Sequence, residues 1–254
     1  MTKSRLVVRT IRNIPTFVLD YLGLLRRDVE YVLRSGHTTV VARAGTADCR
    51  EIVVVMSGYE YDLSLLPSLE HPVVFDVGAH IGSFTLYALD HFNTSEPRIV
   101  AFEPEEENFR YLKLNIMRNR ISPSRCVLRN CAIGTYNGFA TLDTSTRNDA
   151  YAIVSDPRGA FQECPVRTLE QVASDEGIRR IDVLKVDIEG GEHAVFADEE
   201  TLRFIGGSVR FILVEHHVID DWRDKRWLAA RLEPNFSQFF ERGDVMYFRN
   251  TRIV

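Results

Sequence analysis

Two glycines and two carboxylates near the middle of the chain have the spacing of a nucleoside-binding loop. Asp76 lies in the apolar run VVFDV at 73–77, and Gly78 and Gly82 complete the spacing D-x-G-x-x-x-G. Glycine permits positive φ and lets a ligand approach the backbone closely. Glu103 ends the next apolar run, 21 residues after Gly82, where a carboxylate can accept both hydroxyls of a ribose. A ribose-bearing ligand with a cationic group near Asp76 would use all four residues.

The same stretch excludes two common phosphate-binding loops. A G-x-G-x-x-G dinucleotide fingerprint starting at Gly78 would need glycines at 80 and 83, but these positions hold His80 and Ser83. A P-loop would need Gly-Lys-Ser/Thr, which the sequence lacks. S-Adenosylmethionine carries a ribose together with a sulfonium and an α-amino group, so the pattern favours it. The alternative is a tight turn that binds no ligand.

A second group of ionisable residues lies in the segment LKVDIEGGEH at 184–193. Lys185, Asp187 and Glu189 share parity, so in an extended strand they point to one face. An alcohol that accepts a methyl group has to lose its proton, and a positioned base contributes about 10²–10⁴-fold. We therefore predict Asp187 as the base, with Glu192 as a supporting group or as an acid favouring a helix N-terminus. A purely structural pair between Lys185 and a carboxylate is the alternative.

Three more ionisable residues, Glu215, His216 and His217, follow the apolar run at 210–215. Alternation puts Glu215 and His217 on one face and His216 on the other. We predict that Glu189, Glu215 and His216 support the base or orient the acceptor. A divalent cation held by Asp187, Glu215 and a histidine is an alternative. The sequence favours it less, because lone histidines are more often structural, and we assign no metal ligand.

The elements that must position these residues alternate in type from residue 72 onward. Short apolar runs alternate with helical patterns, which is typical of βαβ units and a parallel sheet in an α/β protein. A turn signal at 242–244 separates the last two runs and predicts a terminal hairpin. The predicted strands are 73–77, 98–103, 125–131, 181–187, 210–215, 236–241 and 245–249.

Residues 1–70 are predicted to form an N-terminal helical and β-rich cap or lid, and residues 71–254 the ligand-binding domain. The cap is expected to contain a helix broken near Pro15 and β-rich runs at 29–33 and 38–44 around a Ser35-Gly36 turn. Residues 46–57 fit a helix or a strand. Residues 132–165 lack a helical period and are expected to form an inserted β-hairpin or loop.

The charge distribution bears on partners and location. The chain carries a formal net charge of −5, so it offers no general attraction for nucleic acid. Residues 1–27 differ, with six basic residues and one acid interleaved with apolar residues. Peripheral contact of this segment with an anionic membrane is one interpretation. A helix docked on the main domain is the alternative that we favour. We find no signal peptide or bilayer-spanning run, which predicts a cytoplasmic protein.

Six segments in order resemble the FkbM-type family of S-adenosylmethionine-dependent methyltransferases. They are VVFDVGAHIGSFT, VAFEPEEENFRYLKLNI, CAIG, VRTLEQV, LKVDIEGGEHAVF and FILVEHH. The resemblance covers roughly residues 71 to 217. It implies the seven-stranded, Rossmann-like class I methyltransferase sheet, mostly parallel with a C-terminal antiparallel hairpin. It also implies methyl transfer to a hydroxyl oxygen of a sugar, glycan or secondary metabolite.

Carried over residue by residue, the resemblance implies roles for the first group. Asp76, Gly78 and Gly82 would shape the methionine end of the pocket. Glu103 would bind the ribose, and residues 130 to 132, including Asn130 and Ala132, would border the adenine. His80 and Asp187 would also border the cofactor. His80 departs from the family, which more often has Asn there.

Two other classes of function remain open from the sequence. A nicotinamide-dependent oxidoreductase would share the sheet, but His80 and Ser83 oppose it. A binding domain of the same fold without catalysis is the second. The acceptor is not encoded in any motif, because it would be recognised by residues 1–70, the 132–165 insertion and C-terminal loops, which vary freely.

Overall fold

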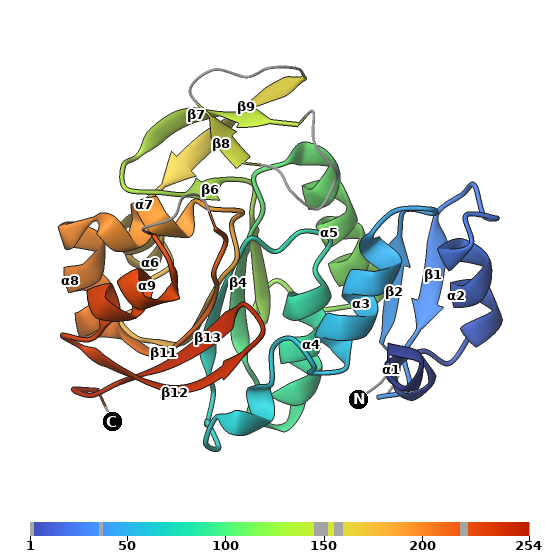
Figure 1. Ribbon diagram of the computed structural model, residues 1–254, viewed down its shortest axis with the longest axis horizontal. Coiled ribbons are helices and arrows are strands. Elements are labelled where there is room, and N and C mark those ends of the chain that lie inside the picture. The colour runs from blue at the N-terminus through green and yellow to red at the C-terminus, as the bar shows by residue number, and fades with distance from the viewer. Residues whose placement is uncertain (1–2, 36–37, 145–151, 155–159, 219–222, 254) are drawn as a thin grey trace.

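The computed structural model describes residues 3–35, 38–144, 152–154, 160–218 and 223–253, and its centre is a seven-stranded sheet (Figure 1). The strand order is β12-β13-β11-β10-β3-β4-β5. β13 runs antiparallel to both of its neighbours, and all other pairs are parallel. The predicted fold, a mostly parallel sheet with a C-terminal antiparallel hairpin, is confirmed. The strands are β3 (Val73–Val77), β4 (Arg98–Phe102), β5 (Cys126–Arg129), β10 (Ile181–Val186), β11 (Val209–Glu215), β12 (Phe236–Arg242) and β13 (Val245–Asn250).

Helices cover both faces of this sheet, because successive strand residues enter two different hydrophobic cores. Val74 joins the core under α4 and α5, whereas Phe75 joins the core under α6, α8 and α9. β10 is buried at every position. Among the described residues, no helix has the length and apolar character needed to cross a bilayer. The helices are α4 (Ser83–His91), α5 (Glu106–Arg118), α6 (Leu169–Asp175), α7 (Glu192–Ala197), α8 (Glu199–Ser208) and α9 (Lys225–Leu232), with short 3₁₀ turns η1 (Leu63–Leu65) and η2 (Asn93–Ser95).

The N-terminal cap packs beside α4 and α5 at one end of the molecule (Figure 1). The predicted break near Pro15 is confirmed, since Pro15 lies in the first turn of α2, where a missing N–H costs nothing. The ambiguous stretch 46–57 is helical, because α3 buries Ile52 and Val53 and has two acids in its first turn. Residues 36–37, within the predicted turn, lie outside the described residues. The elements are α1 (Lys3–Thr10), α2 (Ile14–Tyr21), β1 (Val29–Val32), β2 (Thr39–Ala42) and α3 (Asp48–Met56).

Two asparagines one helical turn apart attach the cap to the main domain. Asn115 of α5 accepts from the Val41 N–H at 2.7 Å and donates to the Val41 carbonyl at 3.0 Å. Asn119 makes the same pair of bonds with Thr39, at 2.9 and 2.7 Å. Thr39 and Val41 lie in β2, an edge strand of its two-stranded sheet. The side-chain amides of the two asparagines therefore satisfy backbone groups of β2 that a further strand would otherwise pair with.

The segment at 132–165 forms a small sheet rather than a single hairpin. Its strand order is β6-β9-β7-β8, and β7 with β9 forms the antiparallel pair that the sequence predicts. Residues 145–151 and 155–159, within this insertion, lie outside the described residues. Figure 1 shows the small sheet beyond the carboxyl ends of the main strands, where it forms one wall of the candidate site. The strands are β6 (Ala132–Ile133), β7 (Gly138–Asp143), β8 (Ala152–Val154) and β9 (Phe161–Arg167).

Candidate active site

A cavity of about 900 Å³ lies at the carboxyl ends of β3, β4, β10 and β11. Parallel strands bring their ends to one edge of the sheet, which is where open α/β sheets bind ligands. The cap and the small sheet supply the remaining walls. Seven of the predicted site residues line the cavity: Gly78, His80, Glu103, Ala132, Asp187, Glu189 and Glu215.

The two glycines of the loop after β3 are required by contacts within the protein. Gly78 has φ of 81°, and a Cβ there would lie 1.7 Å from the carbonyl oxygen of Asp187. Gly82 has φ of 96°, and its Cβ would lie 2.8 Å from Leu112 Cδ1. Gly82 lies behind the cavity wall rather than in it. The bare backbone therefore lets the loops after β3 and β10 touch, and this contact shapes one end of the cavity.

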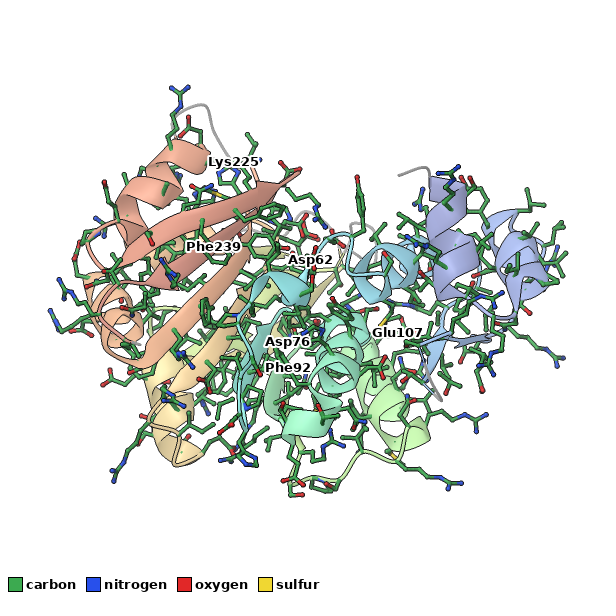
Figure 2. The ribbon with its side chains drawn as sticks, turned by 90° about the horizontal axis from the view of Figure 1, so that it is seen from below. Asp62, Asp76, Phe92, Glu107, Lys225 and Phe239 are labelled. Carbon is green, nitrogen blue, oxygen red and sulfur yellow. The ribbon has the colours of Figure 1, made fainter. Side chains whose placement is uncertain are left out.

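Asp76 lies in the interior of the molecule (Figure 2), where it is completely buried. It does not line the cavity. Its carboxylate accepts a hydrogen bond from the Thr85 hydroxyl and lies 3.3 Å from Lys185 Nζ. Lys185 also donates to the Gly78 carbonyl at 2.6 Å and lies 3.4 Å from Asp187 Oδ2. The cationic group that Asp76 holds is therefore Lys185. The structural pairing of Lys185 that the sequence leaves open is present, and it joins the two loops.

Glu103 presents its carboxylate at the opposite end of the cavity. Its side chain is fixed by backbone donors, since Oε2 accepts from His80 at 2.8 Å and Oε1 from Glu105 at 3.0 Å. Burial raises the pKa of Glu103, and the neighbouring His80 and these donors counteract the rise. Held in this way, the carboxylate keeps lone pairs available for the hydroxyls of a ligand.

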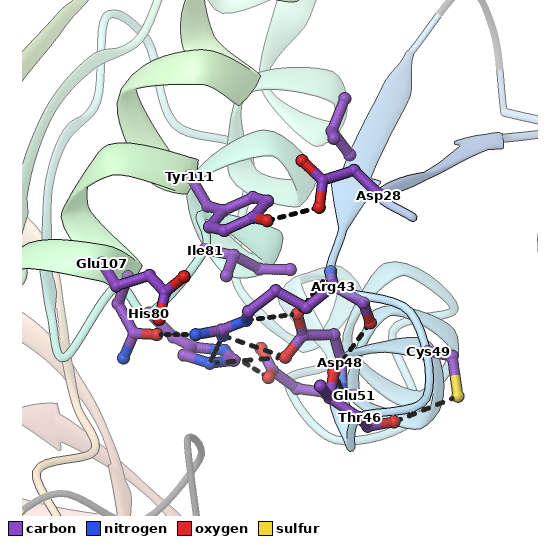
Figure 3. Close-up of polar contacts among 12 residues, drawn as sticks. Asp28, Arg43, Thr46, Asp48, Cys49, Glu51, His80, Ile81, Glu107 and Tyr111 are labelled. Atoms are coloured by element: carbon purple, nitrogen blue, oxygen red, sulfur yellow. Dashed lines mark hydrogen bonds and ion pairs between the residues drawn. The ribbon is translucent and has the colours of Figure 1, made fainter. Parts of the chain in front are cut away.

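A polar cluster connects the cap to the loop that holds Glu103 (Figure 3). The Arg43 guanidinium donates to Asp48 at 2.9 and 3.0 Å and lies 2.8 Å from His80 Nε2. Arginine has no acceptor, so in the neutral form of His80 the proton lies on Nδ1, which faces the Glu51 carboxylate. Burial lowers the pKa of His80, but Glu51 and Asp48 outweigh burial and raise it to about 9. Because the backbone N–H of His80 donates to Glu103, the cap helix α3 helps to position the Glu103 carboxylate indirectly.

The wall next to Glu103 is apolar and belongs partly to the small sheet. Ala132, Ile133, Leu142 and Val166 line it. Asn130 does not line the cavity, because its amide donates to the carbonyls of Glu103 and Pro104 at 2.8 and 3.1 Å. An apolar wall beside a hydroxyl-binding carboxylate suits a flat heteroaromatic base attached to a ribose.

At the other end of the cavity, Tyr61 brings together acids from two strands. Its hydroxyl lies 3.0 Å from Asp187 Oδ2 and 3.0 Å from Glu215 Oε2. Burial opposes ionisation of Asp187, but Lys185 and His217 hold its pKa below the ordinary value. Burial and the nearby Asp187 raise the pKa of Glu215 to about 7. Near neutral pH, Asp187 is therefore ionised while Glu215 exchanges its proton.

His217 also faces this end of the cavity. Its Nδ1 lies 3.2 Å from Glu192 Oε1, and its Nε2 lies 3.5 Å from Glu189 Oε2 and 3.8 Å from Asp187 Oδ1. Burial lowers its pKa, but these carboxylates outweigh burial and raise it to about 9. His217 is therefore an imidazolium at neutral pH, and Glu192, which does not line the cavity, contacts its wall through His217 and the Gly190 N–H.

His216 lies on the other side of β11, as the alternation of the sequence indicates. It is buried, and its Nε2 lies 2.9 Å from the Arg223 carbonyl. Its ring packs edge-on against His193, with the centroids 5.1 Å apart. His216 therefore does not join the cavity, and the predicted supporting role has no geometric basis.

Within the part of the chain that the structure describes, two groups of side chains have ligand atoms close enough together for a divalent cation. They are Asp187, Glu189 and His217, and Asp48, Glu51 and His80. The first group takes Glu189 in place of the expected Glu215. In the first group the Lys185 ammonium and the His217 imidazolium already balance the carboxylates, and in the second the Arg43 guanidinium does so. These resident positive charges oppose cation binding, and we assign neither group as a metal site.

Tyr61, Glu60 and His217 line the cavity but were not among the predicted site residues. Tyr61 and Glu60 belong to the cap, and the Tyr61 bond to Asp187 spans 126 residues of sequence. No local pattern identifies such a partner. His217 was accessible to sequence reasoning, because it shares parity with Glu215.

Comparisons of the sequence with known proteins identify methyltransferases as relatives. The sequence profile of the methyltransferase FkbM domain matches residues 76–244. The chain is 29% identical over 228 residues to the 31-O-demethyl-FK506 methyltransferase FkbM of Streptomyces tacrolimicus, covering 76% of this chain and 84% of that protein. It is 28% identical over 201 residues to the methyltransferase sdnD of Sordaria araneosa, covering 66% and 72%.

A solved structure, the methyltransferase FkbM from Methylobacillus flagellatus KT, shares the fold. The TM-score is 0.50 at 16% identity, over 94% of this chain and 59% of that one. The profile match covers most of the main domain, including the loops after β3, β4, β10 and β11 that line the cavity. The chain belongs to the FkbM methyltransferase family.

Proposed function

We propose that the chain is an S-adenosylmethionine-dependent O-methyltransferase that acts on a hydroxyl group of a small natural product or sugar. The main support for the proposal is that two kinds of binding surface lie at opposite ends of one cavity. A fixed carboxylate, Glu103, lies beside an apolar wall at one end, and an acid pair, Asp187 and Glu215, lies at the other. The relative named for methylating 31-O-demethyl-FK506 supports an oxygen acceptor on a small molecule.

The cavity walls fit the donor in shape and in charge. Glu103 would hold the ribose, and Ala132 with its apolar neighbours would border the adenine. The lining carries six acids against four basic side chains, and this excess of acids favours a ligand with a sulfonium and an ammonium group. When bound, the donor supplies an electrophilic methyl group on sulfur. The acids are Glu51, Glu60, Glu103, Asp187, Glu189 and Glu215, and the bases are Arg50, Lys185, His80 and His217.

The chain's own residues then have to orient the acceptor and remove its proton. A base works best when its pKa lies near the operating pH. Sequence reasoning ranks Asp187 first, but the pKa of about 7 makes Glu215 the better proton acceptor. Asp187, kept ionised by Lys185, would orient the acceptor hydroxyl. Tyr61 can donate to whichever of the two carboxylates is charged.

In the transfer, an oxygen–carbon bond would form as the sulfur–carbon bond of the donor breaks, and Glu215 would accept the hydroxyl proton. Incubation of the chain with methyl-labelled S-adenosylmethionine and with hydroxylated polyketides or glycosides tests the proposed function. We expect label in a product that survives mild alkali, as an ether does, and loss of turnover in Glu215→Gln. Alkali-labile label, typical of a methyl ester, would overturn the assignment to oxygen of a hydroxyl group.

A further inference from the structure

The helix α2 buries Phe17 and its one acid, and it leaves its other large apolar side chains mostly exposed to solvent. Asp20 is buried, accepting hydrogen bonds from the Tyr31 hydroxyl and from the Gly45 N–H at 2.6 Å. Tyr21, at the end of the helix, is instead 59% exposed, and Leu22 and Leu24, just beyond it, are 61% and 62% exposed. Because Asp20 fixes the rotation of the helix, its exposed apolar side chains cannot turn inward. The exposed apolar set on α1, α2 and the following segment is Val8, Val18, Leu19, Tyr21, Leu22 and Leu24.

The exposed charged side chains within residues 3–27 have one sign, and the exposed Asp28 that follows them accepts a hydrogen bond from the Tyr111 hydroxyl at 2.6 Å. Arg5 and Arg9 lie on α1, Arg12 follows it, and Arg26 and Arg27 follow α2; all five are exposed. Asp20 is the one acid in residues 3–27, and it is buried. We call the exposed apolar set and these five arginines the α1–α2 surface. It lies at the end of the molecule opposite the C-terminal hairpin (Figure 1).

We propose that the α1–α2 surface binds an anionic lipid bilayer. Exposed apolar side chains with exposed arginines on the same two helices and the segment after them match the headgroup boundary of a bilayer, where the apolar side chains enter the acyl region and the arginines meet the phosphates. A second copy of the chain is a poor occupant, because a symmetric contact would place two surfaces of the same charge against each other. Bilayer binding would hold the enzyme at the interface by its cap, on elements that contribute no side chain to the cavity.

Co-sedimentation of the full chain with vesicles tests the proposal. We expect binding to phosphatidylcholine vesicles that contain phosphatidylglycerol, weakened by salt, and little binding to pure phosphatidylcholine. Each arginine near the surface is worth about five-fold in affinity, so Arg26→Gln with Arg27→Gln should lose about 25-fold. Leu22→Gln with Leu24→Gln should also weaken binding, because apolar insertion is lost.

Matched controls come from exposed residues elsewhere. Met117→Gln on α5, at a residue 65% exposed, and Arg203→Gln on α8 should bind like wild type. Thermal melts would show that every variant is folded. Three results would overturn the proposal: no binding to anionic vesicles, equal binding to neutral ones, or self-association that the α1–α2 substitutions abolish. The last result would assign the surface to a second copy.

Discussion

Replacement of Lys185 by Met should strongly destabilise the fold, because it leaves Asp76 as a buried charge without its counter-ion. Lys185 Nζ lies 3.3 Å from Asp76 Oδ1 and donates to the Gly78 carbonyl, and both charged side chains are buried. Breaking a buried ion pair by removing one partner costs about 3–5 kcal/mol. At roughly 2–4 °C per kcal/mol for a chain of this size, Tm should fall by roughly 6–20 °C.

Urea and thermal denaturation measure this change, and two variants sharpen it. Adding Asp76→Asn to Lys185→Met should recover part of the loss, because the unpaired charge is removed. Lys225→Met is the surface control: Lys225 pairs with Glu241 and Asp244 while partly exposed, so it should cost no more than about 1 kcal/mol. Figure 2 shows the contrast between interior Asp76 and peripheral Lys225.

The pH dependence gives a further check on the same pair. Burial raises the pKa of Asp76, although Lys185 opposes the rise, so loss of Lys185 should raise it more. A carboxyl whose pKa is raised on folding stabilises at low pH and loses that contribution as pH rises through its folded value. The deficit of Lys185→Met should therefore be small near pH 4 and grow toward neutral pH. A deficit below about 1 kcal/mol at pH 7, or one independent of pH, would refute the reasoning.

Three further predictions concern the cavity and its loops. Tyr61→Phe removes a hydrogen bond from ionised Glu215, so the acid limb of the pH profile of kcat should move up by about one pH unit. Tyr59→Phe, at an exposed residue, is the control and should leave the profile unchanged. Superimposable profiles for Tyr61→Phe and the wild type would contradict this. Gly78→Ala should unfold or severely destabilise the chain in urea melts, whereas Gly207→Ala, with open space around it, should be neutral or stabilising by about 0.4–1 kcal/mol; a well-folded Gly78→Ala variant would refute the loop contact. Treatment with a chelator should leave methyl transfer unchanged, because the charged side chains of Lys185, His217 and Arg43 already balance the carboxylates of both candidate groups. Activity that depends on added Mg²⁺ would instead favour a metal site.

The fold was predictable because the strands that form it are buried on both faces. Runs such as VVFDV and RFILVE are apolar at four of five and four of six positions, and this pattern is visible without any knowledge of neighbouring strands. The exceptions are residues 46–57, where IVVVM suggests a strand but lies in helix α3, and the small sheet, whose short strands pair only through the insertion itself. The attachment of β2 through Asn115 has no local pattern either.

The site was predictable only in part, for a geometric reason. Sequence spacing indicates which residues reach the carboxyl edge of the sheet, and Glu103 and Asp187 do line the cavity. Sequence spacing does not indicate which of these side chains point into the cavity. Asp76 and Asn130 were expected to contact the ligand, but Asp76 pairs with Lys185 and Asn130 binds the Glu103 carbonyl. Partners from the cap, such as Tyr61, meet the site only after folding.

The central claim is that Glu103 and the loop after β3 hold an adenosyl donor. Calorimetric titration of S-adenosylhomocysteine into the chain and into Glu103→Gln tests it most directly, with exposed Glu106→Gln as the matched control. Hydrogen bonds to a charged group contribute about 1.5–3 kcal/mol, so Glu103→Gln should raise Kd by roughly 10–100-fold and the control should not. No binding by the wild-type chain, or equal Kd values for all three proteins, would contradict the account.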